Sequence, residues 1–165
     1  GEWSKAALAE LRCLDGAIHE SACVSAIGSN ALTRCIKVDD FTLPNELAVP
    51  KSSIIGVLMD GIHFDKEHYD RPTVYDTLRF SRSREEALAS EKPRMNTDLV
   101  TTSVHGLPFS HGLHACPGHF FAVNNVKMIL AQPLLDYEIQ PFAARPPNVA
   151  IGDMSVILID PTMMI

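Results

Sequence analysis

The stretch FSHGLHACPGHFFA, residues 109–122, places three histidines and one cysteine between glycines and leads directly into an apolar segment. Pro117 suits the first position of a helix, where its missing N–H costs nothing, so the sequence predicts a helix over 117–132 with Cys116 at its N-cap. A thiol at an N-cap lies beside unpaired backbone N–H groups and the positive end of the helix dipole, which lowers its pKa. Cys116 is therefore the leading candidate for a metal ligand in this chain.

The residues around Cys116 suit a flat, bulky ligand. Gly112 and Gly118 allow tight backbone turns and keep side chains out of the path of such a ligand. Phe109 and Phe120 are placed to shield the sulfur from water. A single axial thiolate with a glycine-rich approach and apolar walls is what haem iron needs on one face.

Two other interpretations of the same residues stay open at this point. A single cysteine at a helix start is more often inert than a ligand. Zinc is the second alternative, because imidazole and thiolate are its usual ligands. Structural zinc sites draw on two separated segments, however, whereas all four candidates here lie within one turn and a helix start: His111, His114, Cys116 and His119.

Composition indicates one ordinary globular domain. The chain has 165 residues, 46% of them hydrophobic, and a formal net charge of -6, which argues against nucleic acid as a partner. No apolar run reaches the roughly 18 residues that a membrane span needs, and no signal-peptide pattern opens the sequence. The four cysteines form no CxxC pair, which predicts free thiols: Cys13, Cys23, Cys35 and Cys116.

Hydrophobic periodicity predicts the elements of the first sixty residues. Apolar residues at steps of three or four predict a helix over 2–23. An extended run follows over 32–38, and Pro44-Asn45 predicts a turn between two short strands. An apolar strand is predicted over 54–59, so that a small antiparallel sheet is expected.

The second part of the chain is less regular. Residues 60–108 predict mostly coil, apart from a short helix at 66–69. The 117–132 helix should end or kink at Pro133, and its expected buried face carries Val123, Val126, Leu130 and Leu134. A final buried strand is predicted over 154–159.

Three segments resemble the cytochrome P450 monooxygenases, and fungal members most. The 109–122 stretch is similar to the family's haem loop, FxxGxRxCxG. HESAC, residues 19–23, lies where the family has its ExxR helix motif, and YDRPTVYDTLRF, residues 69–80, looks like the meander segment that precedes the haem loop. The haem-loop positions that match are Phe109, Gly112, His114, Cys116, Gly118 and Ala122.

The resemblance implies a fold as well as a site. Residues 1–165 would form one partial domain, the C-terminal portion of the P450 catalytic domain, without the central helix and the N-terminal anchor. That portion is α+β and mainly helical, with two main helices, small antiparallel hairpins and an ordered coil under the haem. Glu20 and Arg79 would belong to the Glu-Arg-Arg cluster that ties this coil down.

The resemblance also implies a function. Cys116 would be the proximal iron ligand, and the family reaction inserts oxygen into a small apolar substrate with electrons from an NADPH-dependent reductase. The family's usual location is the cytosolic face of the endoplasmic reticulum membrane, through an N-terminal anchor. Two alternatives stay open for this chain, which we expect to be inactive alone: a haem-binding fragment without turnover, and a degenerate, nonfunctional remnant.

The sequence departs from the family pattern at two arginine positions. Cys23 stands where the ExxR motif has arginine, and a thiol cannot replace a planar guanidinium with five donors. His114 stands where the haem loop offers arginine to a haem propionate, and it donates one hydrogen bond there. Arg34 is a second candidate for a propionate partner.

Overall fold

The structure is a computed structural model that describes residues 3–26, 30–89, 97–140, 148–151 and 154–157. Its helices are α1 (Lys5–Glu10), α2 (Arg12–Val24), α3 (Met59–His63), α4 (Arg79–Ala89) and α5 (His119–Asp136), with a 3-10 turn, η1, at Gly112–His114. Its strands are β1 (Asn30–Cys35), β2 (Phe41–Thr42), β3 (Ala48–Val49), β4 (Ile54–Leu58), β5 (Asn148–Ile151) and β6 (Met154–Ile157). Helices with small sheets confirm the α+β expectation.

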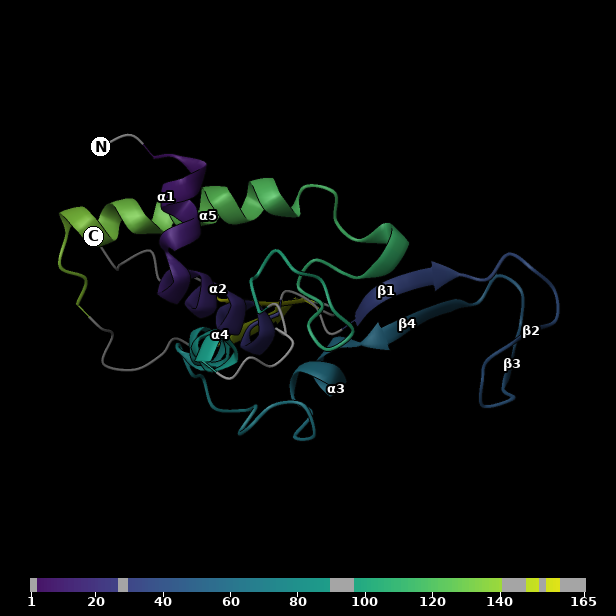
Figure 1. Ribbon diagram of the computed structural model, residues 1–165. Coiled ribbons are helices and arrows are strands. Elements are labelled where there is room, and N and C mark those ends of the chain that lie inside the picture. The colour runs from purple at the N-terminus through teal and green to yellow at the C-terminus, as the bar shows by residue number, and fades with distance from the viewer. Residues whose placement is uncertain (1–2, 27–29, 90–96, 141–147, 152–153, 158–165) are drawn as a thin grey trace.

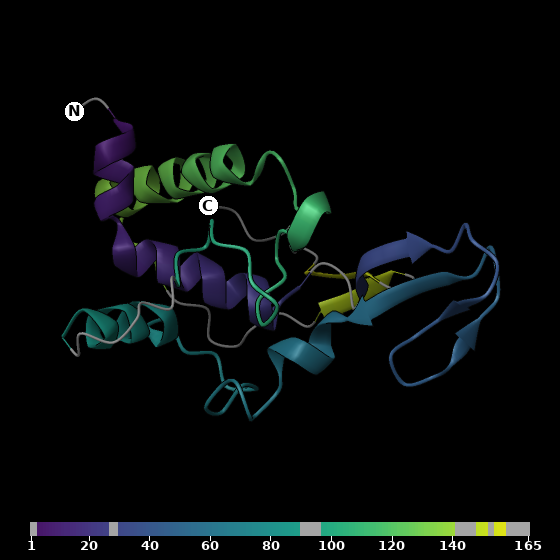
Figure 2. The same cartoon turned by 45° about the vertical axis from the view of Figure 1, so that its right-hand side comes forward.

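The helices gather at one end and a long hairpin projects from the other. Figures 1 and 2 show α1, α2, α4 and α5 together, with α3 and η1 between this group and the β1–β4 hairpin. All strands pair in antiparallel twos, β1 with β4, β2 with β3 and β5 with β6. Among the described residues, none of the helices combines the length and apolar character that crossing a bilayer requires.

The first predicted helix is broken in two. Ser4 caps α1 by accepting a hydrogen bond from the Ala7 N–H, and Leu11 then leaves helical geometry with φ -76° and ψ 60°. α2 starts directly afterwards, so the chain changes direction between the two helices. A continuous helix over 2–23 was therefore a wrong prediction, since a periodic apolar pattern survives such a break.

The hairpins follow the sequence pattern closely. β4 covers the predicted strand except Met59, which begins α3. The Pro44-Asn45 turn joins β2 and β3, as predicted. The predicted helix at 66–69 is only a turn, in which the N–H groups of His68 and Tyr69 both reach the Asp65 carbonyl. Part of the predicted last strand, residues 158 and 159, lies outside the described residues.

α4 is a main helix that the sequence analysis assigned to coil. Its sequence, RFSRSREEALA, is too charged to show an apolar stripe. The helix packs on α2 instead, where a Cβ on Gly16 would come within 3.2 Å of the Ser81 nitrogen. Three helices of at least 11 residues are therefore described, not two.

α5 buries a different face from the one predicted. Val123, Lys127 and Ala131 form the buried stripe, at steps of four. Three residues expected in the core are exposed on the helix: Val126, Leu130 and Leu134. Pro133 does not end the helix, which continues through Leu134 and Leu135 to Asp136, because a proline near the C-terminal end removes only one backbone hydrogen bond.

Candidate functional site

Cys116 lies on the loop between η1 and α5, with its thiol exposed. The N-cap of α5 is Gly118 and the first helical residue is His119, so the predicted capping position of Cys116 was wrong. Backbone hydrogen bonds hold the loop instead. The Cys116 N–H donates to the Phe109 carbonyl at 2.9 Å, and the Cys116 carbonyl accepts from the His119 N–H at 3.4 Å.

The glycines beside Cys116 leave open space around the loop. Gly112 has φ +76°, a conformation that favours glycine, and Ser110 shares this left-handed region with φ 64°. A Cβ on Gly112 or Gly118 would meet no atom within 4 Å. An exposed thiol framed by two open glycine positions fits a flat iron-bearing group, in line with the chemistry of a soft sulfur donor.

The other predicted site residues lie on different elements and differ in exposure. Phe109 is half-buried and packs against the His119 ring at a centroid distance of 5.9 Å. His114 is exposed at the end of η1, and Ala122 lies in the first turn of α5. Arg34 is exposed on β1, where its Nη1 donates to the Thr33 carbonyl at 2.8 Å.

The structure brings Glu20 and Arg79 into direct contact. Arg79 Nε lies 2.9 Å from Glu20 Oε2, and Arg79 Nη2 lies 3.2 Å from Oε1. The Glu20 side chain is 1% exposed. Arg79 also donates to three carbonyls of the coil before it, those of Asp70, Arg71 and Val74. One guanidinium therefore joins α2 to the whole turn of chain from 70 to 74.

Within the part of the chain that the structure describes, Glu20 pairs with one arginine, Arg79, and its carboxylate is well satisfied. The Asp76 N–H donates to Oε1 at 2.9 Å, in addition to the two bonds from Arg79. Cys23 is buried one turn along α2, and burial together with the Glu20 charge raises the pKa of its thiol to about 12. The coil keeps its anchor through a backbone amide and one arginine.

A second buried ionic cluster was missed by the sequence analysis. Asp15 on α2 contacts Lys127 Nζ at 2.5 Å and Arg84 Nη2 at 3.1 Å, and it accepts from the Leu99 N–H at 3.0 Å. Arg84 also pairs with Asp98 at 2.7 Å. The cluster joins α2, α4, α5 and the segment after residue 96. The sequence signal that could have revealed it is Lys127, a charged residue among the apolar residues of α5.

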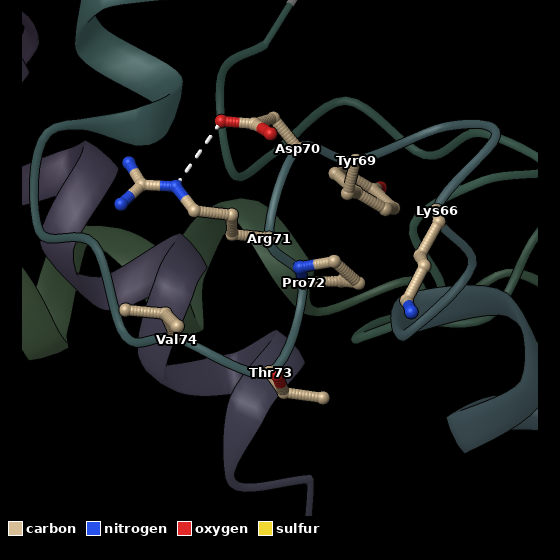
Figure 3. Close-up of a pocket in the computed structure, with 7 residues that line it drawn as sticks. All are labelled: Lys66, Tyr69, Asp70, Arg71, Pro72, Thr73 and Val74. Carbon is tan, nitrogen blue, oxygen red and sulfur yellow. Dashed lines mark hydrogen bonds and ion pairs between the residues drawn. The ribbon is translucent and has the colours of Figure 1, made fainter.

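The hollow shown in Figure 3 is lined by residues of the coil and does not include Cys116. It has a volume of about 410 Å³ and is lined by Lys66, Tyr69, Asp70, Arg71, Pro72, Thr73 and Val74. None of the predicted site residues lines it. The carbonyls of residues 70, 71 and 74 bind Arg79, so this hollow belongs to the same turn of chain.

No zinc-type cluster forms among the described residues, where no group of three or more His, Cys, Asp or Glu side chains could hold a metal ion. His111 and His119 are half-buried and bonded, His111 to the Thr102 hydroxyl and His119 to the Cys116 carbonyl. His111 and His119 thus have separate partners, which disfavours the zinc alternative.

Comparisons with known sequences identify the family of the chain. The sequence pattern that defines the Cytochrome P450 family matches residues 2–165. Cytochrome P450 monooxygenase 103 of Postia placenta is 36% identical over 153 residues, covering 91% of this chain and 29% of that protein. Cytochrome P450 monooxygenase BOA4 of Botryotinia fuckeliana is 34% identical over 164 residues, covering 98% and 32%. The chain thus spans less than a third of the length of these relatives.

Solved structures share the fold. A cytochrome P450, CYP102L1, superposes with a TM-score of 0.67 at 19% identity over 94% of this chain and 32% of that chain. CYP109E1 from Bacillus megaterium, solved with testosterone, gives a TM-score of 0.58 at 20% identity over 93% and 38%. From the family pattern, the fungal relatives and the shared fold, the chain belongs to the cytochrome P450 family of haem-dependent monooxygenases.

Proposed function

We propose that this chain is the haem-holding, C-terminal portion of a cytochrome P450 monooxygenase, with Cys116 as the iron's thiolate ligand. The observation that carries the proposal is the Cys116 loop itself. Its thiol is exposed, its backbone is tied to Phe109, and the positions of Gly112 and Gly118 are open. This arrangement offers one soft ligand and room for a planar group.

Haem, when bound through a thiolate, supplies oxygen activation, because the sulfur pushes electron density toward iron and favours O–O cleavage. The residues of this chain would bind the haem and orient it. Cys116 gives up its thiol proton on binding, and its backbone N–H stays committed to Phe109. His114 and Arg34 are the proposed hydrogen-bond donors to the propionates, and both are exposed. Phe109 limits the access of water to the sulfur.

Glu20 and Arg79 hold the underside of this site. Their ion pair is almost completely buried, so it is weakly screened by solvent and geometrically restrictive. Since Arg79 binds the coil through three carbonyls, the pair fixes the coil against α2. Its role is structural, and it takes no part in the chemical step.

The reaction that we propose for the whole protein is oxygen insertion into a small apolar substrate, with electrons from an NADPH-dependent reductase. Membrane attachment at the endoplasmic reticulum belongs to the same proposal. The chain spans less than a third of its relatives, and it leaves the apolar residues of α5 exposed. The exposure of Cys116 and α5 favours a second candidate for this chain alone, haem binding without turnover.

The test is an absorption spectrum of the purified chain mixed with haem, reduced and exposed to carbon monoxide. The proposal predicts the strongly red-shifted Soret band of a thiolate-bound carbonyl and its loss in Cys116→His. Cys35→Ser, a change at another exposed cysteine, is the matched control and should keep the band. An ordinary Soret position in all three proteins contradicts the thiolate assignment and favours a nonfunctional remnant.

A reductase assay then separates turnover from binding. With oxygen, NADPH and a reductase, we expect no product from this chain alone even when the thiolate spectrum is present. Product formation that Cys116→Ala abolishes would instead show that the chain is a complete catalyst.

A further inference from the structure

His63, the last residue of α3, is a buried histidine with both ring nitrogens engaged. The residue is 3% exposed. Nδ1 lies 3.2 Å from the Cys23 carbonyl, and Nε2 lies 3.1 Å from the Leu107 nitrogen. A backbone N–H only donates, so Nε2 accepts and Nδ1 carries the proton. The two bonds therefore select one neutral tautomer of His63.

One end of this bridge rests on α2. The Cys23 carbonyl belongs to the last turn of that helix, where carbonyls have no partner within the helix. Cys23 is three residues after Glu20, the carboxylate that anchors the coil. The imidazole thus bonds to the helix whose Glu20 holds the coil through Arg79.

The other end leads to the Cys116 loop by two further backbone bonds. The Leu107 carbonyl accepts from the Ser110 N–H at 3.0 Å, and the Phe109 carbonyl accepts from the Cys116 N–H at 2.9 Å. Leu107 is itself 2% exposed. Because Phe109 and Ser110 are adjacent, fixing Leu107 restricts where the Cys116 amide can lie.

We infer that His63 is a positioning residue for the Cys116 loop, which it ties to α2 through a donor bond to Cys23 and an acceptor bond from Leu107. The inference rests on the proposed function of Cys116. His63 does not touch the proposed haem site, and it acts through residues 107–110. Burial lowers the pKa of His63, which keeps the neutral, bridging form.

Three variants separate the two bonds. His63→Gln extends its amide about as far as Nε2 and keeps an acceptor for the Leu107 N–H. His63→Asn reaches about as far as Nδ1 and keeps only the bond to the Cys23 carbonyl. His63→Phe removes both bonds and preserves the ring volume. His68→Gln, a change at a partly exposed histidine five residues away, is the matched control.

The first readout is amide hydrogen exchange on the full chain without haem. We expect the Ser110 and Cys116 amides to exchange at least tenfold faster in His63→Asn and His63→Phe. The His63→Gln variant should keep these two amides protected, and the α5 amides around Val123 should keep wild-type rates in every variant. Equal rates at Cys116 in all proteins overturn the inference, as does an equal increase throughout α5, which would report a loss of overall stability.

The second readout is the carbon monoxide spectrum of the haem-loaded chain. We expect the thiolate-type fraction to fall at least threefold in His63→Asn and His63→Phe, and to stay near the wild-type value in His63→Gln and His68→Gln. If wild-type chain gives no thiolate band, the proposed function fails, while amide exchange still decides whether His63 positions the loop. A normal band in all variants overturns the positioning role.

Discussion

Lys127 on α5 and Asp15 on α2 form an ion pair in the interior, with Nζ 2.5 Å from Oδ1 and side chains that are 8% and 3% exposed. Burial acts to raise the pKa of Asp15, but Lys127, the Leu99 N–H and Arg84 outweigh it and leave that pKa below its usual value. The Asp15 carboxyl is therefore ionised near neutral pH. It fixes the helix that follows the Cys116 loop against the helix that carries Glu20.

Removing one partner of this pair should cost stability. For Lys127→Met, we expect a loss of about 3–5 kcal/mol in the free energy of unfolding, because Asp15 stays buried without its lysine. The measurement is urea denaturation followed by circular dichroism. Lys51→Met, which breaks an exposed pair with Asp39, is the control and should change stability by less than about 1 kcal/mol. Equal effects of the two changes would contradict a buried, charged pair.

Arg79 should not be replaceable by lysine. Lysine keeps the charge but lacks the planar set of donors that reaches both Glu20 oxygens and the three carbonyls of the coil. We expect Arg79→Lys to lower the free energy of unfolding by about 2 kcal/mol or more. Arg71→Lys, in an exposed pair with Asp70, serves as the control in the same denaturation experiment. A stable Arg79→Lys protein would mean that charge alone holds the coil.

Mild acid should destabilise the chain through two buried histidines. Burial lowers the pKa of His19 and His63 below the usual 6.5, so the folded state favours their neutral forms. Their contribution is fully present above about pH 6.5 and is lost as the pH falls through the lower folded pKa values. Urea midpoints measured from about pH 7 to 5 should fall, and the double variant His19→Asn, His63→Gln should show a flatter profile.

The cysteines should differ in reactivity toward iodoacetamide. Cys23 is buried and the pKa of its thiol is raised to about 12, so it stays protonated and protected. We expect mass spectrometry to find label on the exposed Cys13, Cys35 and Cys116, and on Cys23 only after denaturation. Labelling of Cys23 in the folded chain at the rate of Cys13 would show that the α2 contact with the coil opens readily.

Ser110 holds a left-handed backbone conformation, with φ 64°, beside the Cys116 loop. Glycine adopts this conformation without the steric cost of a Cβ, so Ser110→Gly should stabilise the chain by up to about 1 kcal/mol. The same change in the middle of α4, Ser83→Gly, should destabilise by a similar amount, because glycine is unfavourable inside a helix. Thermal denaturation of the two variants provides the comparison, and a loss of stability in both would argue against strain at Ser110.

Local patterns predicted the hairpins, the existence of α5 and the contact between Glu20 and Arg79, the last through the family resemblance. They failed where contacts between distant segments determine whether a helix forms and which of its faces is buried. α4 has too many charges to show a buried face, yet Arg79 and Arg84 within it bind carboxylates of α2. The buried face of α5 is set by Lys127, whose charge excluded it from an apolar pattern.

The start of α5 shows a second limit. Pro117 suits the first turn of a helix, and the helix was predicted to begin there, but the chain stays in turns until Gly118. The hydrogen bond from the Cys116 amide to Phe109 belongs to the loop and competes with helical geometry. Such a bond spans seven residues, and periodicity carries no information about it.

The anchors of α2 have a consequence for the order in which the chain folds. Glu20 meets Arg79 across 59 positions, and Asp15 meets Leu99 across 84. Contacts between such distant residues must first overcome the entropy of closing a long loop, and they slow folding. During synthesis, α2 leaves the ribosome before its partners do, and the carboxylates of Asp15 and Glu20 stay unpaired until Arg79 and Lys127 have followed. The packing of α2 is therefore completed only after α5 has been synthesised.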